Sequence, residues 1–162
     1  MILYHGSDIL IEKIDFDKSR PFKDFGKGFY LSADYNQALD MAKQRVKKKM
    51  GVGVPIVTAF EFDESVMNSN ELKVKAWNEY CVEWLEFVVR NRDRKQSSPC
   101  HDYDIVYGPI ADDSVSYQIR RYEVGYLTVE QLIDELKYEG GITFQYFFAN
   151  EKAISKLIRI CD

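Results

Sequence analysis

The chain has 162 residues, of which 46% are hydrophobic, and its 22 basic and 26 acidic side chains give a formal net charge of −4. This composition excludes intrinsic disorder, and we expect one domain that spans residues 1–162. The acidic balance argues against a nucleic-acid-binding surface that covers the whole molecule. Because no apolar run approaches a membrane span and the three cysteines lack metal-ligand spacing, we expect a cytoplasmic protein without a metal site or a membrane partner.

The first half of the chain alternates strand and helix patterns. An apolar run over 2–5, stopped by Gly6, predicts a strand, and the irregular stretch 7–28 predicts a binding loop. A strand follows over 29–32. Asp34 with Gln37 then resembles a capping box, and apolar side chains at 35, 39, 42 and 46 predict a helix that ends near three successive lysines. β-branched and aromatic residues over 56–62 predict the next strand.

The second half predicts more helix. Apolar spacing indicates helices over 78–92 and 112–122, and a capping box formed by Thr128 and Gln131 begins another that ends before Gly140. Strands are predicted over 103–107, 142–148 and 157–160, with a short helical piece near Glu151. Because helices and strands do not alternate regularly as βαβ units, the pattern favours an α+β fold.

Few residues stand out as chemical groups on their own. There is neither a dinucleotide-binding glycine fingerprint nor a P-loop. Cys100 and His101 are adjacent, but neighbours on an extended chain point to opposite faces, which disfavours a nucleophile and base pair. Three segments remain: 4–7, where His5 precedes a glycine; 24–32, where Gly26 and Gly28 bracket a lysine; and 144–148, where polar Gln145 interrupts an apolar strand.

Two of these segments carry a resemblance. Residues 26–32, Gly-Lys-Gly-Phe-Tyr-Leu-Ser, and residues 4–7, Tyr-His-Gly-Ser, resemble signatures of diphtheria-toxin-type ADP-ribosyltransferases and poly(ADP-ribose) polymerases. Over almost its full length the chain is more similar to a bacterial family known as domain of unknown function 3990, which is grouped with that superfamily. The further matching pieces are 18–21, 84–88, 103–106 with 108–109, and the segment from 145 onward. The resemblance implies an ADP-ribosyltransferase-like fold of split mixed or antiparallel sheets flanked by helices.

The resemblance also implies a site for NAD, the co-substrate. In it, His5 would bind the adenosine ribose, Gly6 would offer its backbone to the nicotinamide amide, and Tyr30 would stack on the nicotinamide ring. Gln145 occupies the third position of the superfamily's His-Tyr-Glu pattern. Ser7 and Arg20 would assist at the ribose and pyrophosphate, and Gly26 and Gly28 would complete the cofactor-binding set. Ala38 stands where polymerases have a serine, so we expect single-unit transfer rather than polymer formation.

Gln145 makes the activity itself a question. Cleavage of the bond between nicotinamide and ribose develops positive charge on the sugar, which a glutamate would stabilise and a neutral amide would not. Loss of about 3 kcal/mol of such stabilisation slows a reaction about a hundredfold. Glu139, Glu151 or a carboxylate of the target are potential replacements.

Three functions therefore stay open. The first is an NAD-dependent mono-ADP-ribosyltransferase that modifies a protein or nucleic acid. The second is a catalytically silent module that binds NAD, another nucleotide or a protein. The third, compatible with the first, is the toxin of a bacterial toxin-antitoxin or defence pair with a cognate antitoxin protein.

Overall fold

The computed structural model describes residues 1–96, 99–138 and 141–160, which form an α+β fold. The strands are β1 (Ile2–Ser7), β2 (Phe29–Leu31), β3 (Ile56–Phe62), β4 (Val74–Ala76), β5 (Ile105–Pro109), β6 (Phe144–Phe148) and β7 (Leu157–Arg159). The α-helices are α1 (Tyr35–Lys48), α2 (Val82–Arg92), α3 (Asp113–Glu123), α4 (Val129–Tyr138) and α5 (Glu151–Ile154), and 3₁₀ turns span Phe16–Lys18 and Glu64–Asn68.

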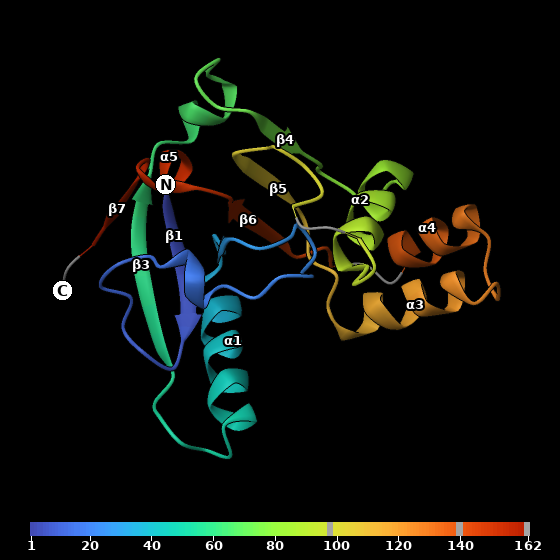
Figure 1. The fold of residues 1–162 in the computed structure, drawn as a ribbon. Helices are drawn as coiled ribbons and strands as arrows, with labels where there is room; N and C mark the ends of the chain where they lie inside the picture. Colours follow the sequence, from blue (N-terminus) through green and yellow to red (C-terminus); the bar gives the residue numbers. More distant parts are fainter. Residues whose placement is uncertain (97–98, 139–140, 161–162) are drawn as a thin grey trace.

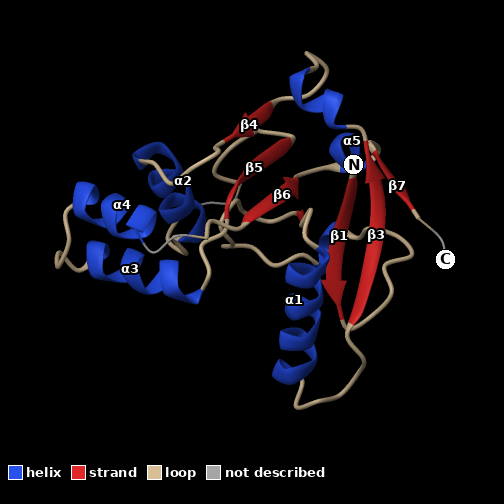
Figure 2. Ribbon diagram, turned by 180° about the vertical axis from the view of Figure 1, so that it is seen from behind, coloured by secondary structure: helices blue, strands red, loops and turns tan. Residues whose placement is uncertain are grey.

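The strands are divided between two sheets. One has the order β1-β3-β7 and is antiparallel; the other has the order β2-β6-β5-β4, antiparallel except for the parallel pair β4–β5. Figure 1 shows α1 lying along the first sheet, whereas α2, α3 and α4 gather on the far side of the second. The view from behind shows the same separation (Figure 2). The expected arrangement of mixed and antiparallel sheets with flanking helices is confirmed at this level.

The side chains on the two faces of β6 pack into two different apolar clusters. Tyr146 and Phe148 pack with Leu3 of β1 and Phe60 of β3 in a cluster between the two sheets. Phe147 points to the opposite face, into the cluster formed with α2, α3 and α4. Because side chains alternate along a strand, Gln145 lies on the same face as Phe147, on the helical side of the sheet.

Helix α1 begins where the sequence predicts. The Asp34 carboxylate accepts hydrogen bonds from the backbone N–H groups of Asn36 (2.8 Å) and Gln37 (3.3 Å), which satisfies two donors at the helix start. The Gln37 side chain does not reach back to Asp34 as a full capping box requires. It donates to the carbonyl of Phe144 (3.4 Å) and so ties α1 to the start of β6.

The structure corrects several boundaries. Helix α2 begins only at Val82, after Cys81 as its N-cap, and β6 begins at Phe144. Strand β4 is missing from the sequence-based prediction because its three residues have no alternation to detect. It forms through tertiary pairing of Val74 with Ile105 on β5. In the described part of the chain no helix is long and apolar enough to cross a membrane.

Candidate functional site

The two sheets touch at one bridge and then separate. Tyr4 and Ser32 exchange two backbone hydrogen bonds of 2.7 and 2.9 Å. In an antiparallel pair the next bonded partners would be Gly6 and Tyr30. The Tyr30 carbonyl instead accepts a hydrogen bond from Nδ1 of His5 (2.8 Å). The Gly6 N–H and C=O, which point to the same side as those of Tyr4, therefore face the gap between the sheets.

His5 is held as a neutral ring. It stacks on Phe29 with 4.5 Å between the ring centres, and burial lowers its pKa to about 4, with the charges of Arg45 and Lys23 acting in the same direction. Because Nδ1 donates to Tyr30, the Nε2 atom of the neutral ring carries a lone pair. His5 thus offers a hydrogen-bond acceptor, which suits a ligand hydroxyl.

Gly6 has a structural role that the sequence does not reveal. A Cβ atom at this position would lie 1.8 Å from the carbonyl oxygen of Ala38 in α1. Ala38, which is 3% exposed, is therefore committed to this close contact between helix and strand. The packing of α1 on β1 therefore requires a glycine at this position.

Tyr30 closes the loop that precedes it. Its hydroxyl donates to the carbonyl of Gly26 (2.7 Å) and accepts from the N–H of Phe25 (3.1 Å), and burial raises its pKa well above the ordinary value. Its ring centre lies 5.1 Å from that of Phe147 and 4.7 Å from the ammonium of Lys23. The ring is thus already in contact with a cation.

The glycines of this loop are also explained by packing. Gly26 adopts a φ of +95°, and a Cβ at Gly28 would lie 2.2 Å from the ring of Phe147. Substitution at either position would distort the loop that carries Tyr30. The structure thus explains both glycines by the shape of this loop, and their role in NAD binding stays a prediction.

His101 supports the same loop. Its Nδ1 accepts from the N–H of Tyr103 (3.1 Å), so its Nε2 carries the proton and donates to the carbonyl of Phe25 (2.8 Å). Cys100 donates from its thiol to the carbonyl of Arg90 (3.5 Å). Both ring nitrogens of His101 are occupied by backbone groups, so the histidine holds the loop and does not activate the cysteine.

A group of cations borders His5 and Ser7. Ser7 is 1% exposed, and its hydroxyl accepts from Nη1 of Arg45 (3.0 Å). Desolvation lowers the pKa of Lys23, and the charges of Arg45, Arg20 and Lys48 lower it further. In residues 1–96, 99–138 and 141–160, Arg20, Lys23 and Arg45 form no ion pair within 4.0 Å. These cations are available to an anion although the protein is acidic as a whole.

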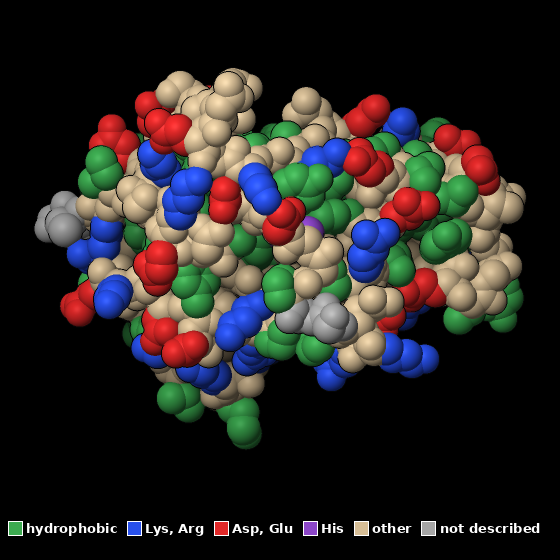
Figure 3. All heavy atoms as spheres, turned by 45° about the horizontal axis from the view of Figure 1, so that its top comes forward, with side chains coloured by type: hydrophobic (Ala, Val, Ile, Leu, Met, Phe, Trp, Pro, Cys, Tyr) green, Lys and Arg blue, Asp and Glu red, His purple; other side chains and the backbone are tan. Residues whose placement is uncertain are grey.

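This concentration of positive charge is local. On the face shown in Figure 3, acidic and basic side chains are interspersed, as on an ordinary protein surface. The predicted helper Arg20 is exposed and belongs to the cationic border of the site. The other predicted helper, Ser7, is buried, and its hydroxyl is connected to these cations by the hydrogen bond from Arg45.

Gln145 belongs to a buried polar network that sequence reasoning missed. Its Nε2 donates to Oδ2 of Asp24 (2.9 Å), which also accepts from the N–H of Ala111 (2.9 Å). The other oxygen, Oδ1, accepts from Nε of Arg92 (2.9 Å) and from the Nη2 of the same guanidinium. Asp24 opens the glycine-bracketed loop, which was the only sequence signal for its involvement.

Asp24 is thus the carboxylate that the fold brings to Gln145. Of the two glutamates suggested as replacements, Glu151 begins α5 beyond the opposite end of β6, and Glu139 lies outside the described residues. Asp24 and Gln145 are 8% and 9% exposed. Phe25, the residue after Asp24, donates its N–H to the Tyr30 hydroxyl (3.1 Å), so the network lies beside that hydroxyl, and the Asp24 charge adds to burial in raising the pKa of Tyr30.

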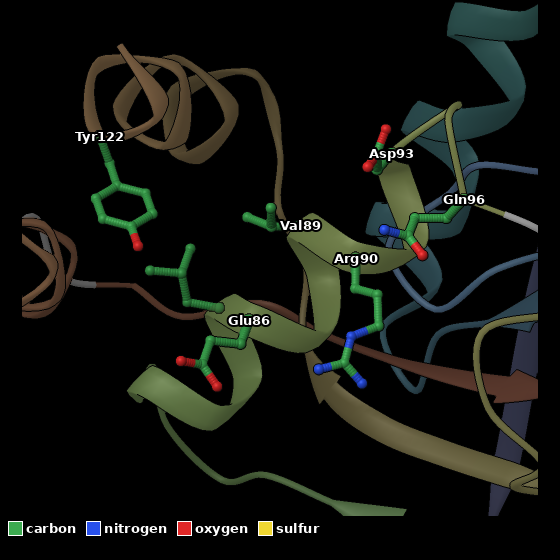
Figure 4. Close-up of a pocket in the computed structure, with 7 residues that line it drawn as sticks. Glu86, Val89, Arg90, Asp93, Gln96 and Tyr122 are labelled. Carbon is green, nitrogen blue, oxygen red and sulfur yellow. The ribbon is translucent and has the colours of Figure 1, made fainter. Parts of the chain in front are cut away.

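A separate surface cavity of about 350 Å³ lies between α2 and α3. Figure 4 shows Tyr122 of α3 directed toward α2, which supplies most of the lining. None of the predicted site residues lines this cavity. The residues that do are Leu85, Glu86, Val89, Arg90, Asp93, Gln96 and Tyr122.

Comparison with known families places the chain. Residues 1–158 match the model of the family described as "Protein of unknown function (DUF3990)", and the chain belongs to this family. No curated protein and no solved structure matches the chain. The expected similarity to domain of unknown function 3990 is confirmed over nearly the whole length.

Proposed function

We propose that this protein is an NAD-dependent mono-ADP-ribosyltransferase with an ADP-ribosyltransferase-like fold. The observation that carries the proposal is the open backbone edge of Gly6 next to the neutral ring of His5, at the point where β1 and β2 separate. A carboxamide has one acceptor and two donors, and the Gly6 N–H and C=O complement it with one donor and one acceptor. His5 Nε2 complements a ribose hydroxyl.

Neighbouring groups of the site would suit the remaining parts of NAD. The nicotinamide ring of NAD is an aromatic cation, and Tyr30 already has the Lys23 ammonium over its ring. Displacement of that ammonium would let the nicotinamide ring take the same face. Arg20, Lys23 and Arg45, which form no ion pair within the part of the chain that the structure describes, would suit the pyrophosphate, which needs positive charge without a competing carboxylate.

The reaction would break the bond between the ribose and the nicotinamide nitrogen. Its electron pair leaves with nicotinamide, which departs as a neutral molecule, and the cationic sugar carbon accepts an electron pair from the acceptor, which releases a proton. No general acid is needed because the leaving nitrogen is already cationic. The protein's own contribution would be to orient the nicotinamide ring and the ribose bonded to it, and to supply hydrogen-bond acceptors to the ribose hydroxyls.

The acceptor in this proposal is a macromolecule, a protein or a nucleic acid. A role as the toxin of a two-component pair, restrained by an antitoxin protein, is compatible with it. Arrested growth on expression, relieved by co-expression of the neighbouring gene, would support that role. Normal growth at high expression would oppose it.

One observation favours a catalytically silent module instead. Gln145 is neutral, and its amide nitrogen is bonded to Asp24, whose two oxygens accept four hydrogen bonds. No carboxylate in this network is free to stabilise a sugar cation. In that case the protein would bind NAD without cleaving it.

Nicotinamide release separates the two functions. The purified protein is incubated with NAD, alone and with cell extract, and nicotinamide is quantified together with NAD affinity. We expect release that falls at least about tenfold in Tyr30→Ala, because stacking and burial of the ring are both lost. Tyr107→Ala, a half-buried tyrosine on the other face of the same sheet, is the matched control. NAD binding without release would establish the silent module, and absence of both would refute the proposal.

A further inference from the structure

The Asp24 carboxylate fixes the direction of the Gln145 amide. A carboxylate only accepts hydrogen bonds, so the amide group that meets Asp24 Oδ2 has to be the N–H donor, Nε2. The rest of the carboxylate is saturated by Arg92 and the Ala111 N–H. Arg92 is itself anchored by the Ser116 hydroxyl (2.9 Å) and the Ala111 carbonyl (2.7 Å). Rotation of the Gln145 amide by a half turn would bring two oxygens together and leave this network incomplete.

The amide oxygen, Oε1, is the end of the Gln145 side chain that can still accept a hydrogen bond from a ligand. Among the residues that the structure describes, Oε1 of Gln145 has no hydrogen-bond donor, while Nε2 is committed. Gln145 shares the helical face of the sheet with Tyr30, because Phe147, two residues further along β6, pairs directly with Tyr30. A ligand that contacts Gln145 from this face meets an acceptor.

We propose that the ion pair between buried Asp24 and half-buried Arg92 is a positioning device that locks Gln145 with Oε1 toward the ligand, so that the site selects hydroxyl donors such as a ribose diol. This inference rests on the proposed function for the identity of the ligand. It also has a consequence that the family pattern does not suggest: Gln145→Glu does not create a glutamate site. It places a second carboxylate against Asp24 in a buried setting.

The lock can be tested without any ligand. Asp24 is the charged group bonded to Gln145, and the charged and titratable groups around Asp24 are Lys23 from the same loop, Arg92 from α2 and Tyr30 from β2. On β5, uncharged Gly108 pairs with position 145. The Arg92 groups that face Asp24 are already engaged by it, so burial and repulsion by the Asp24 carboxylate raise the pKa of a glutamate at 145. Stability of Gln145→Glu is then close to wild type at pH 4 and falls as the pH rises through that raised pKa.

Melting temperature against pH measures this effect. We expect Gln145→Glu to lose several degrees relative to wild type between pH 4 and 8, and the double variant Asp24→Asn/Gln145→Glu not to show that loss. Asn150→Asp is the matched control. Asn150 Nδ2 donates to Asp104 (2.7 Å), which is again a hydrogen bond from an amide to a carboxylate, but at a more exposed position. A Gln145→Glu curve parallel to wild type would overturn the inference.

Ligand binding tests the direction of Oε1. Calorimetry compares nicotinamide riboside, which carries the ribose hydroxyls, with nicotinamide, which does not. We expect Gln145→Ala to weaken the riboside about tenfold and nicotinamide less than twofold. Asp24→Asn, which frees the amide to rotate, should lower the rate of nicotinamide release more than it changes the KM for NAD. Equal weakening of both ligands would overturn the inference. If wild type binds neither ligand, the proposed function fails, while the pH experiment still decides whether the lock exists.

Discussion

Gly6→Ala tests whether helix packing demands a glycine at the edge of the gap. The added Cβ would lie 1.8 Å from the Ala38 carbonyl oxygen and 2.9 Å from the N of Ala42, both backbone atoms of α1. To restore an ordinary contact, α1 would have to retreat by roughly 1.6 Å, the difference between 1.8 Å and 3.4 Å. Overpacking of a rigid contact costs about 1–3 kcal/mol, and we expect the upper end because no flexible side chain can yield.

The assay is thermal unfolding. For a chain of this size, about 3 kcal/mol corresponds to a melting temperature lower by roughly 6–12 °C. Gly125→Ala is the control, because Gly125 has a φ of +86° but nothing within 4 Å of an added Cβ. Its cost is the left-handed backbone alone, about 1–2 kcal/mol. If Gly6→Ala melts no lower than Gly125→Ala, the steric argument is wrong, and the glycine has to be explained by a ligand alone.

Two further predictions concern the histidines. Between pH 6.5 and about 4 the unfolded chain binds a proton at residue 5 that the folded protein does not, so folding stability falls as the pH is lowered through this window. In urea titrations over this range wild type should lose up to about 3 kcal/mol more than His5→Gln, and parallel curves would contradict the lowered pKa. His101→Ala leaves the Phe25 carbonyl unpaired and should cost about 1–2 kcal/mol in the same assay. Cys100→Ala should cost less than half of that, and an equal loss would argue that the two side chains act together.

Much of the fold could be predicted from local pattern. The spacing of apolar residues and the Asp34 cap located α1 to within a residue or two, because helix periodicity and capping involve residues three or four apart. Strands β3 and β6 were found from their β-branched and aromatic content, and β1 from an apolar run stopped by Gly6. Strand β4 was not, because its existence depends on pairing with β5.

The candidate site divides in the same way. His5, Tyr30 and Gln145 could be singled out as residue types in unusual local settings, but their partners could not. Gln145 and Asp24 are 121 positions apart and His5 and Tyr30 are 25 apart, and no short-range pattern encodes such contacts.

The sequence by itself determined the class of fold, most helix and strand positions and the polar residues worth following, because these depend on neighbours along the chain. Only the tertiary structure decided that the sheets part after the Tyr4–Ser32 bridge, that Gly6 is required by α1, and that Asp24 holds the Gln145 amide. The physical reason is that a buried polar group must find a partner wherever the fold provides one. That partner is chosen by packing in three dimensions.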